Sequence, residues 1–310
     1  MSTAQDTPAK GGRRKLSKKG RVDLAGKSVS AACIAIVVLL VITLIFMVAQ
    51  HGLATFFVNG ISPIAFLTGT EWNPHVDDAN GMPTVGALPM IVGSFAVTLL
   101  STIIAIPFAI GSAIFVVEVA PKFGRSVFQP VVELLVGIPS VVYGLVGMLV
   151  LVPGIRQVFH IPDGSGLLAA IIVLAIMILP SIINVAMTAL EAVPREYEDA
   201  SLALGATATE TWFRVSVPAA RSGIAAAVVL GVGRAIGEAM AVMMVSGNVP
   251  NMPSLFQSVR FLTTAVASEM GYAAAGLQRQ ALFSIALVLF LFIMLINAAL
   301  NFFLKRSKEK

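Results

Sequence analysis

Two residues of opposite charge, Arg234 and Glu238, lie within the apolar stretch 223–245. A charged side chain at the centre of a bilayer costs roughly 2.5–3.5 kcal/mol on insertion scales. The planar donors of arginine match a tetrahedral oxyanion, and arginine stays charged in a partly dehydrated pore. If the stretch is one helix, the i, i+4 spacing places both side chains on one face. We therefore expect anion binding within a membrane, with Glu238 holding Arg234 in place or accepting a proton from the anion.

The same pair also fits a purely structural role, in which a buried ion pair only fixes helix packing. Beside the pair, Gly233, Gly237 and Ala241 form a stripe of small residues. Such stripes let membrane helices approach one another closely. We expect Gly233 and Gly237 to pack against the matching helix of a second membrane subunit, so that a pore would form between two chains.

The composition requires many such helices. The chain has 310 residues, of which 57% are hydrophobic and 12% are charged, and its mean hydropathy is +0.91. Soluble domains contain about 25% charged residues, so this is an integral membrane protein. Its apolar residues form runs of helical length rather than the short alternating strands of a barrel. We expect an all-α polytopic protein with six transmembrane helices, at about 29–48, 87–117, 128–152, 167–189, 223–245 and 281–304.

The distribution of basic residues predicts the orientation of these helices. Eight of the 21 Lys and Arg residues lie in the first 27 positions. With both termini in the cytosol, seventeen basic residues lie on the inner side and three on the outer side, as the positive-inside rule requires. The net charge of +5 therefore indicates orientation rather than a nucleic-acid partner.

The expected division of the chain follows from these spans. It comprises a basic cytosolic tail (1–27), a first transmembrane helix with an extracytoplasmic loop (28–86), a transmembrane domain (87–304) that includes a cytosolic loop (191–222), and a second basic tail (305–310).

No other residues indicate catalysis or metal binding. Three scattered histidines share no helix face, and the single cysteine lies inside the first apolar run. The segment 26–28 resembles the end of a phosphate-binding P-loop, but Arg21 stands where that motif needs its first glycine. Glu133 and Tyr143 fit either packing or a pore. We expect no catalytic residue, metal or cofactor, and a chain that is not an enzyme.

A polar segment between the fourth and fifth runs, residues 191–222, breaks the membrane pattern. Pro194 can begin a helix whose first turns carry acidic residues, which suits the helix dipole. Gly205 is placed to end that helix, and a second short helix is expected from Thr207 to Val215. The segment therefore predicts a helix–turn–helix that serves as a docking element on the cytosolic side.

This segment resembles the "EAA" loop of permeases of binding-protein-dependent ABC importers. Their pattern is Glu-Ala-Ala, three residues, Gly, nine residues, then Ile-x-Leu-Pro. The matching residues here, at the same spacing, are Asp199-Ala200-Ser201, Gly205 and Val215-Ser216-Val217-Pro218. The resemblance implies a type I ABC importer permease. It also implies that Asp199, Ala200, Ser201 and Gly205 couple the chain to an ATPase, because in this family the short helix inserts into a cleft on the ATPase.

Further segments resemble permeases of the phosphate-specific importer, of the PstC type. They are Phe66-Leu-Thr-Gly-Thr-Glu-Trp-Asn-Pro74, Gly86-Ala-Leu-Pro89, Ile114-Phe-Val-Val-Glu-Val-Ala-Pro121, Gly137-Ile-Pro-Ser-Val-Val-Tyr-Gly144 and Gly233-Arg-Ala-Ile-Gly-Glu238. The resemblance implies a bacterial inner-membrane protein that is surrounded by lipid and carries inorganic phosphate. The implied partners are a second homologous permease, two ATPase subunits and an extracytoplasmic phosphate-binding protein.

Three alternatives keep the membrane architecture. The cargo could be another oxyanion such as molybdate or sulfate. The chain could be a channel or an ion-gradient-driven transporter, but it has no obvious internal repeat, and the cytosolic docking loop would then have no purpose. A membrane sensor without transport would not need charges inside the membrane.

Overall fold

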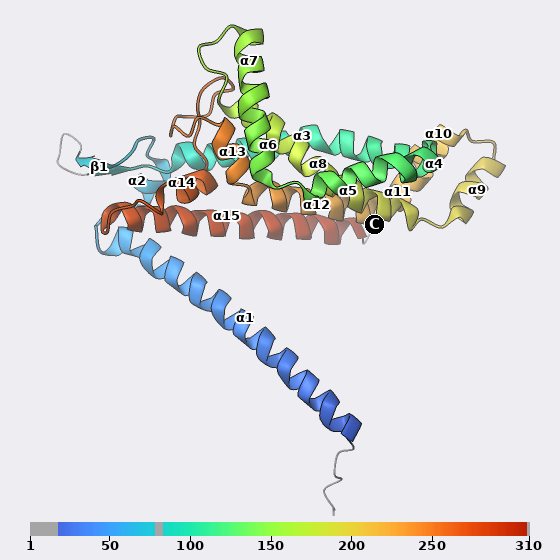
Figure 1. The fold of residues 1–310 in the computed structure, drawn as a ribbon, viewed down its shortest axis with the longest axis horizontal. Helices are drawn as coiled ribbons and strands as arrows, with labels where there is room; N and C mark the ends of the chain where they lie inside the picture. The colour runs from blue at the N-terminus through green and yellow to red at the C-terminus, as the bar shows by residue number, and fades with distance from the viewer. Residues whose placement is uncertain (1–17, 78–82, 309–310) are drawn as a thin grey trace, which may run out of the picture. The chain divides into compact units, whose positions relative to one another are not determined.

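The computed structural model describes residues 18–77 and 83–308 (Figure 1). The chain divides into two compact units, residues 1–48 and 49–310, which are described separately. Helix α1 (Lys18–Phe57) contains the first apolar span, Gly26–Phe57. The predicted tail 1–27 lies outside the described residues up to position 17, and its remainder is helical. The predicted tail 305–310 is likewise helical as far as Lys308.

The described residues contain five helices that are long and apolar enough to cross a membrane, and a sixth if one bent pair counts as a span. This confirms the predicted all-α polytopic class. The five are Gly26–Phe57, Leu88–Val119, Ser140–Phe159, Leu167–Glu191 and Leu277–Phe302, and the pair is Ala208–Ala219 with Arg221–Gly237, bent by 71°.

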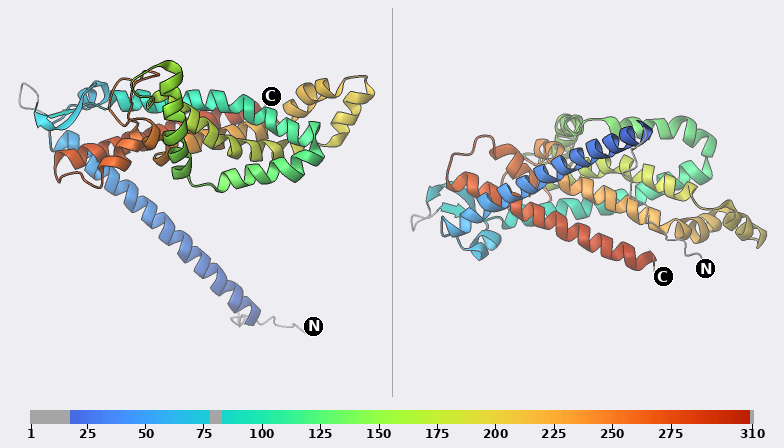
Figure 2. Two further views of the ribbon diagram at one scale, coloured as in Figure 1. Left: turned by 45° about the horizontal axis from the view of Figure 1, so that its top comes forward. Right: turned by 90° about the horizontal axis from the view of Figure 1, so that it is seen from below.

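Four helices of the second unit run along one common direction (Figures 1 and 2). They are α3 (Leu88–Ile114), α8 (Leu167–Glu191), α12 (Arg221–Gly237) and α15 (Leu277–Lys308). Helix α8 packs against α3 and α12 and is apolar on nearly every face, as expected of a buried helix. Its residues Leu174, Ile178 and Ile182 are fully buried and form the centre of the main core.

The third apolar run is not one helix. Helix α5 (Gln129–Gly137) ends at Ile138, and a new helix begins at Ser140. Pro139 is the reason, because a proline drives the preceding residue out of the helical conformation; Ile138 is extended, with φ −69° and ψ 127°. The predicted single span 128–152 is therefore wrong. The second part runs through α6 (Ser140–Val146), a π-helical turn η3 (Gly147–Leu151) and α7 (Val152–Phe159), across the direction of the bundle (Figure 1).

Short elements connect α3 to α5, namely η1 (Phe115–Val119), α4 (Pro121–Phe123) and η2 (Gly124–Phe128).

One end of the bundle, called the hairpin end, carries structure that the sequence did not predict. Strands β1 (Trp72–Asp77) and β2 (Pro83–Val85) pair antiparallel, with Trp72 opposite Val85. They lie with the short helices α2 (Pro63–Thr68) and α14 (Leu262–Glu269), so the predicted loops 49–86 and 246–280 are partly ordered elements. A Cβ on Gly86 would lie 2.3 Å from the carbonyl carbon of Gly69, so this close crossing of the two segments requires glycine.

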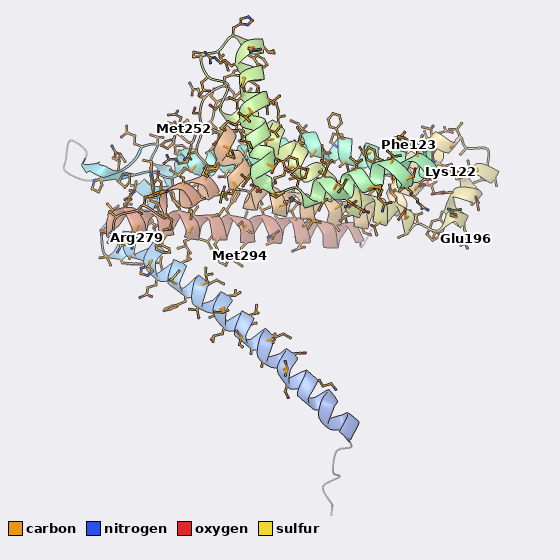
Figure 3. All side chains as sticks on the ribbon, in the orientation of Figure 1. Lys122, Phe123, Glu196, Met252, Arg279 and Met294 are labelled. Atoms are coloured by element: carbon orange, nitrogen blue, oxygen red, sulfur yellow. The ribbon has the colours of Figure 1, made fainter. Side chains whose placement is uncertain are left out.

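The opposite end of the bundle carries the loop between α8 and α12 (Figures 1 and 2). Its elements are α9 (Arg195–Ala203), α10 (Ala208–Thr211), the π-helical turn η4 (Trp212–Ser216) and α11 (Val217–Ala219). Glu196 of α9 and Lys122 of α4 lie at this end, far from Arg279 at the start of α15 (Figure 3).

A buried hydroxyl pair joins the end of α1 to α15 inside the second unit. Ser284 Oγ donates to the Gly52 carbonyl at 2.7 Å and lies 2.7 Å from Thr55 Oγ1. Because Ser284→Ala would leave the buried Thr55 hydroxyl short of a partner, we expect a loss of about 1–3 kcal/mol in unfolding free energy. Thermal unfolding in detergent measures this. The exposed Ser126, which bonds within its own helical turn, is the matched control, and Ser126→Ala should leave the midpoint close to wild type.

Candidate substrate path and coupling loop

Arg234 lies in the last turn of α12 and is held by one neighbouring helix. Its Nη1 donates to Ser181 Oγ of α8 at 2.8 Å, and Ser181 is itself buried. A guanidinium has five N–H donors. Among the described residues Ser181 is the single hydrogen-bond partner, so the half-buried guanidinium keeps most of its donors for a ligand. The arrangement can hold an oxyanion.

Glu238 lies at a break in the fifth apolar run. Helix α12 ends at Gly237, Glu238 is extended (φ −74°, ψ 129°), and α13 (Met240–Val245) begins two residues later. Glu238 Oε1 accepts a hydrogen bond from the Ala241 amide at 2.9 Å, and the Glu238 carbonyl accepts one from Thr263 Oγ1 at 2.9 Å. The carboxylate therefore satisfies an N–H in the first turn of the new helix, a position that favours negative charge.

The predicted continuous helix 223–245 is therefore wrong, and with it the prediction that Arg234 and Glu238 share one helix face. Gly237 weakens the helix at this point because glycine loses more conformational freedom on folding than other residues. The side chain of Glu238 then stabilises the break. Within the described part of the chain the two charges form no ion pair, since Arg234 bonds Ser181 and Glu238 bonds the Ala241 amide.

Buried hydroxyls on α3 face this break. A small cavity of about 10 Å³, large enough for about one water, is lined by Ser94, Thr98, Thr263 and Glu238 among apolar side chains. Further along α3, Ser101 and Thr102 are also buried. These residues were not predicted from the sequence. Their spacing of three and four within an apolar run was the available signal for a polar helix face.

A much larger cavity of about 560 Å³ lies between the α6–α7 segment and α8. Apart from Tyr143, its lining side chains are apolar, and Tyr143 OH donates to the Leu135 carbonyl at 2.8 Å across the Pro139 break. A cavity with so few donors suits a lipid chain or another helix rather than an anion. Glu133 lies outside it, exposed, and accepts a hydrogen bond from Gln129 Nε2 at 3.0 Å. Neither Tyr143 nor Glu133 contacts Arg234 by a hydrogen bond in the described structure.

The two glycines beside the charges differ from Ala241. A Cβ built on Gly233 or Gly237 would meet nothing within 4 Å among the described residues, so both glycines face open space there. Ala241 lies beyond the break and is fully buried against Gly144 of α6. The stripe that could meet a second subunit therefore consists of the exposed face of α12 alone.

The loop at the other end is the predicted helix–turn–helix. Gly205 follows α9 with φ +88°, a backbone conformation that favours glycine. Thr207 then begins α10 with a capping box: its Oγ1 accepts from the Glu210 amide at 3.3 Å, and Glu210 Oε2 accepts from the Thr207 amide at 3.1 Å. Ser201 lies 2.9 Å from Thr211 Oγ1, and Ser216 Oγ donates to Glu198 at 2.9 Å.

The surface of this loop is exposed to an unusual degree. None of the residues of α9 is buried. Asp199, Ala200 and Gly205 are exposed, and Ser201 is half-buried. Large apolar side chains also face outward, with Leu204 89% and Phe213 60% exposed. A rigid helix–turn–helix with exposed apolar side chains is suited to docking on another protein.

Comparison with known proteins identifies the family of this chain. The sequence profile of the binding-protein-dependent transport system inner membrane component matches residues 105–309. The chain belongs to this family. The permease is 46% identical to the probable ABC transporter permease protein YqgH of Bacillus subtilis, over 89% of this chain and 90% of that protein.

Other relatives carry a substrate in their names. The permease is 35% identical to the phosphate transport system permease protein PstC of Mesorhizobium japonicum, over 89% of this chain and 88% of the relative. It is 34% identical to PstC of Pasteurella multocida, over 79% and 81% of the two chains. The fold is similar to an inward-facing structure of the MetNI methionine ABC transporter, with a TM-score of 0.53, 20% identity, and 72% of this chain and 94% of that chain covered. The protein is thus a multi-pass ABC importer permease subunit and not an enzyme.

Proposed function

We propose that this permease carries inorganic phosphate and forms half of the translocation path of an ATP-driven importer. The proposal depends mainly on the half-buried guanidinium of Arg234. Among the described residues it donates one hydrogen bond, to Ser181, and its other N–H groups can bind an anion. Arginine recognises tetrahedral oxyanions through paired hydrogen bonds. The relatives named PstC support phosphate as the cargo, whereas the name of the more similar YqgH gives no substrate.

The exposed loop Asp199–Gly205 supports a role in coupling to the ATPase. Under the predicted orientation, α9 and α10 lie in the cytosol and the hairpin end lies outside. The loop leads through α11 into α12, the helix that carries Arg234. A movement of the loop therefore has a direct covalent route to the proposed anion site. We assign two ATPase subunits and an extracytoplasmic phosphate-binding protein as partners.

The open face of α12 is the proposed contact with a second, homologous permease. Gly233 and Gly237 present no side chain there. Gly233 directly precedes Arg234, and Gly237 follows it by three residues. A helix of the second chain can therefore approach closely enough to complete the surroundings of the guanidinium. The translocation path would then lie between the two permeases.

Transport by the reconstituted complex tests the cargo. The permease is combined with its partner permease, ATPase and binding protein in liposomes, and ATP-dependent uptake of labelled phosphate, sulfate and molybdate is measured. We expect phosphate uptake well above the other two. Faster uptake of sulfate or molybdate would replace phosphate by that oxyanion, and uptake without ATP would contradict an ABC importer.

A substitution series at Glu238 separates its two possible roles. Glu238→Gln keeps an acceptor for the Ala241 amide but cannot take a proton from phosphate, whereas Glu238→Ala loses both. If the carboxylate accepts a proton, Glu238→Gln should preserve assembly and lower the ratio of phosphate to sulfate uptake by about tenfold, the value of one charged hydrogen bond. An unchanged ratio in Glu238→Gln would leave Glu238 with the capping role alone.

A further inference from the structure

A half-buried arginine at the hairpin end, Arg260, joins two segments that follow α13. Its Nε and Nη2 donate to the Asn248 carbonyl at 3.0 and 2.8 Å, and its Nη1 forms an ion pair with Glu269. The two charged side chains are 14% and 23% exposed. A planar guanidinium suits such forked contacts, and lysine cannot reproduce them. Arg260, Asn248 and Glu269 are called the Arg260 cluster.

The turn that Arg260 holds has an unusual backbone. Gly247 and Asn248 have φ values of +75° and +54°, directly after the end of α13. Asn248 Nδ2 donates to Ser268 Oγ at 3.2 Å, while its Oδ1 is buried without a partner among the described residues. Glycine and asparagine are the residues that adopt this left-handed region most readily. The two hydrogen bonds from Arg260 to the Asn248 carbonyl hold this turn against α14.

The Arg260 cluster extends outward to the hairpin. Trp72 of β1 donates from Nε1 to Glu269 Oε2 through a long hydrogen bond of 3.4 Å. Glu269 ends α14, which lies between the hairpin and the α13 segment (Figure 1). The hairpin and α14 are thus connected through one carboxylate that also neutralises Arg260.

The same helix extends inward to the break. Thr263, in the first turn of α14, donates to the Glu238 carbonyl at 2.9 Å. The neighbouring Leu262 amide donates to the buried Ser94 Oγ of α3 at 2.9 Å. Helix α14 is therefore anchored at one end to the Glu238 break and at the other end to Arg260 and Trp72.

We propose that Arg260, Glu269 and Thr263 are positioning residues that link the hairpin to the break at Glu238. Contact of an extracytoplasmic binding protein with the hairpin would shift α14 and thereby change the backbone that carries Glu238. This role rests on the proposed function for its binding protein, but the link itself does not depend on the cargo. None of the three residues needs to touch the transported anion.

Hydrogen exchange in lipid nanodiscs tests the link without any cargo. Trp72→Phe removes the indole N–H, and Thr263→Val removes the hydroxyl. Either change should raise amide exchange in residues 238–246 by about fivefold or more, the lower range of typical couplings between sites. Thr263→Ser keeps the hydroxyl and should restore the wild-type rate.

Matched controls use the same substitutions elsewhere. Trp212→Phe changes the tryptophan of η4 at the opposite end, and Thr188→Val changes a hydroxyl that bonds within its own helix at 3.0 Å. Both should leave exchange in 238–246 at the wild-type rate. The proposal fails if Trp72→Phe and Thr263→Val leave exchange unchanged, or if the controls raise it equally.

A second measurement addresses docking. The ratio of ATPase activity with and without phosphate-loaded binding protein should fall about fivefold or more in Arg260→Lys and Thr263→Val, and recover in Thr263→Ser. If the binding protein stimulates the ATPase as strongly in Arg260→Lys and Thr263→Val as in wild type, the positioning role is wrong. If wild type itself does not respond, the phosphate function is wrong, and the exchange experiment decides the link alone.

Discussion

Replacement of Arg234 by alanine is expected to reduce phosphate uptake by about tenfold to a hundredfold. A hydrogen bond to a charged group contributes about 1.5–3 kcal/mol, and each 1.4 kcal/mol is about a factor of ten. The permease should still assemble, because Arg234 is half-buried and its side chain makes one hydrogen bond within the described structure, to Ser181. Labelled-phosphate uptake, normalised to the amount of purified complex, measures the effect.

Two further variants separate the ligand role of Arg234 from a packing role. Arg234→Lys keeps the charge but loses the planar fork, so we expect partial uptake. Ser181→Ala removes the hydrogen bond that orients Arg234 in the described structure. Because this bond involves a charged group, a loss of about 1.5 kcal/mol, or roughly tenfold in uptake, is expected. Uptake near wild type in Arg234→Ala, with the complex intact, would leave the residue with a structural role only.

Much of the fold could be predicted because its signals are local. Apolar runs longer than eighteen residues define spans, and the polar segment between the fourth and fifth runs defines the helix–turn–helix. The helix ends at this loop were predicted closely, since Pro194, Gly205 and Thr207 are strong start and stop signals. The β hairpin was missed because it has two short strands that depend on pairing with each other and on packing against α15.

The two broken spans show where local signals compete. Pro139 alone predicts an end to α5, but the apolar residues on both sides favoured one continuous helix. At Glu238 the local signal for a helix end is weaker than at Pro139, because Gly237 tolerates both a helical and an extended backbone. The break is stabilised by Thr263, which follows 25 residues later in the chain. A contact of that separation has no signature in the local sequence.

The candidate site was consequently predicted in part. Arg234 can be singled out from the sequence alone, because a charged residue in an apolar run must face protein or water. Its partner could not be predicted, since an i, i+4 spacing favours Glu238 whereas the fold brings Ser181 of another helix closer. Tertiary packing decides the neighbours of Arg234, and its role as an anion ligand stays a prediction.

Substitutions of Gly205 are expected to uncouple ATP hydrolysis from transport in an order set by the backbone. Gly205 has φ +88°, and a Cβ there would meet nothing within 4 Å in the part of the chain that the structure describes, so the cost of a side chain is conformational rather than steric. Asparagine tolerates positive φ better than alanine, and a β-branched valine tolerates it least. Uptake per ATP should therefore fall in the order Asn, Ala, Val, although Asn is larger than Ala. The strain of about 1–2 kcal/mol falls on the turn between α9 and α10 and would displace Asp199, Ala200 and Ser201 from the positions in which we propose that they dock on the ATPase.

Gly111→Ala is the matched control for this series. Gly111 lies within α3, and a Cβ there also meets nothing within 4 Å among residues 18–77 and 83–308. Its backbone is helical, so alanine should be accepted without strain. Co-purification of the ATPase and uptake per ATP distinguish the outcomes. If the Gly205→Val variant binds the ATPase and transports as well as the Gly111→Ala variant, the turn has no part in coupling. If the effect instead follows side-chain size, with Asn worse than Ala, contact with the ATPase rather than backbone strain controls this position.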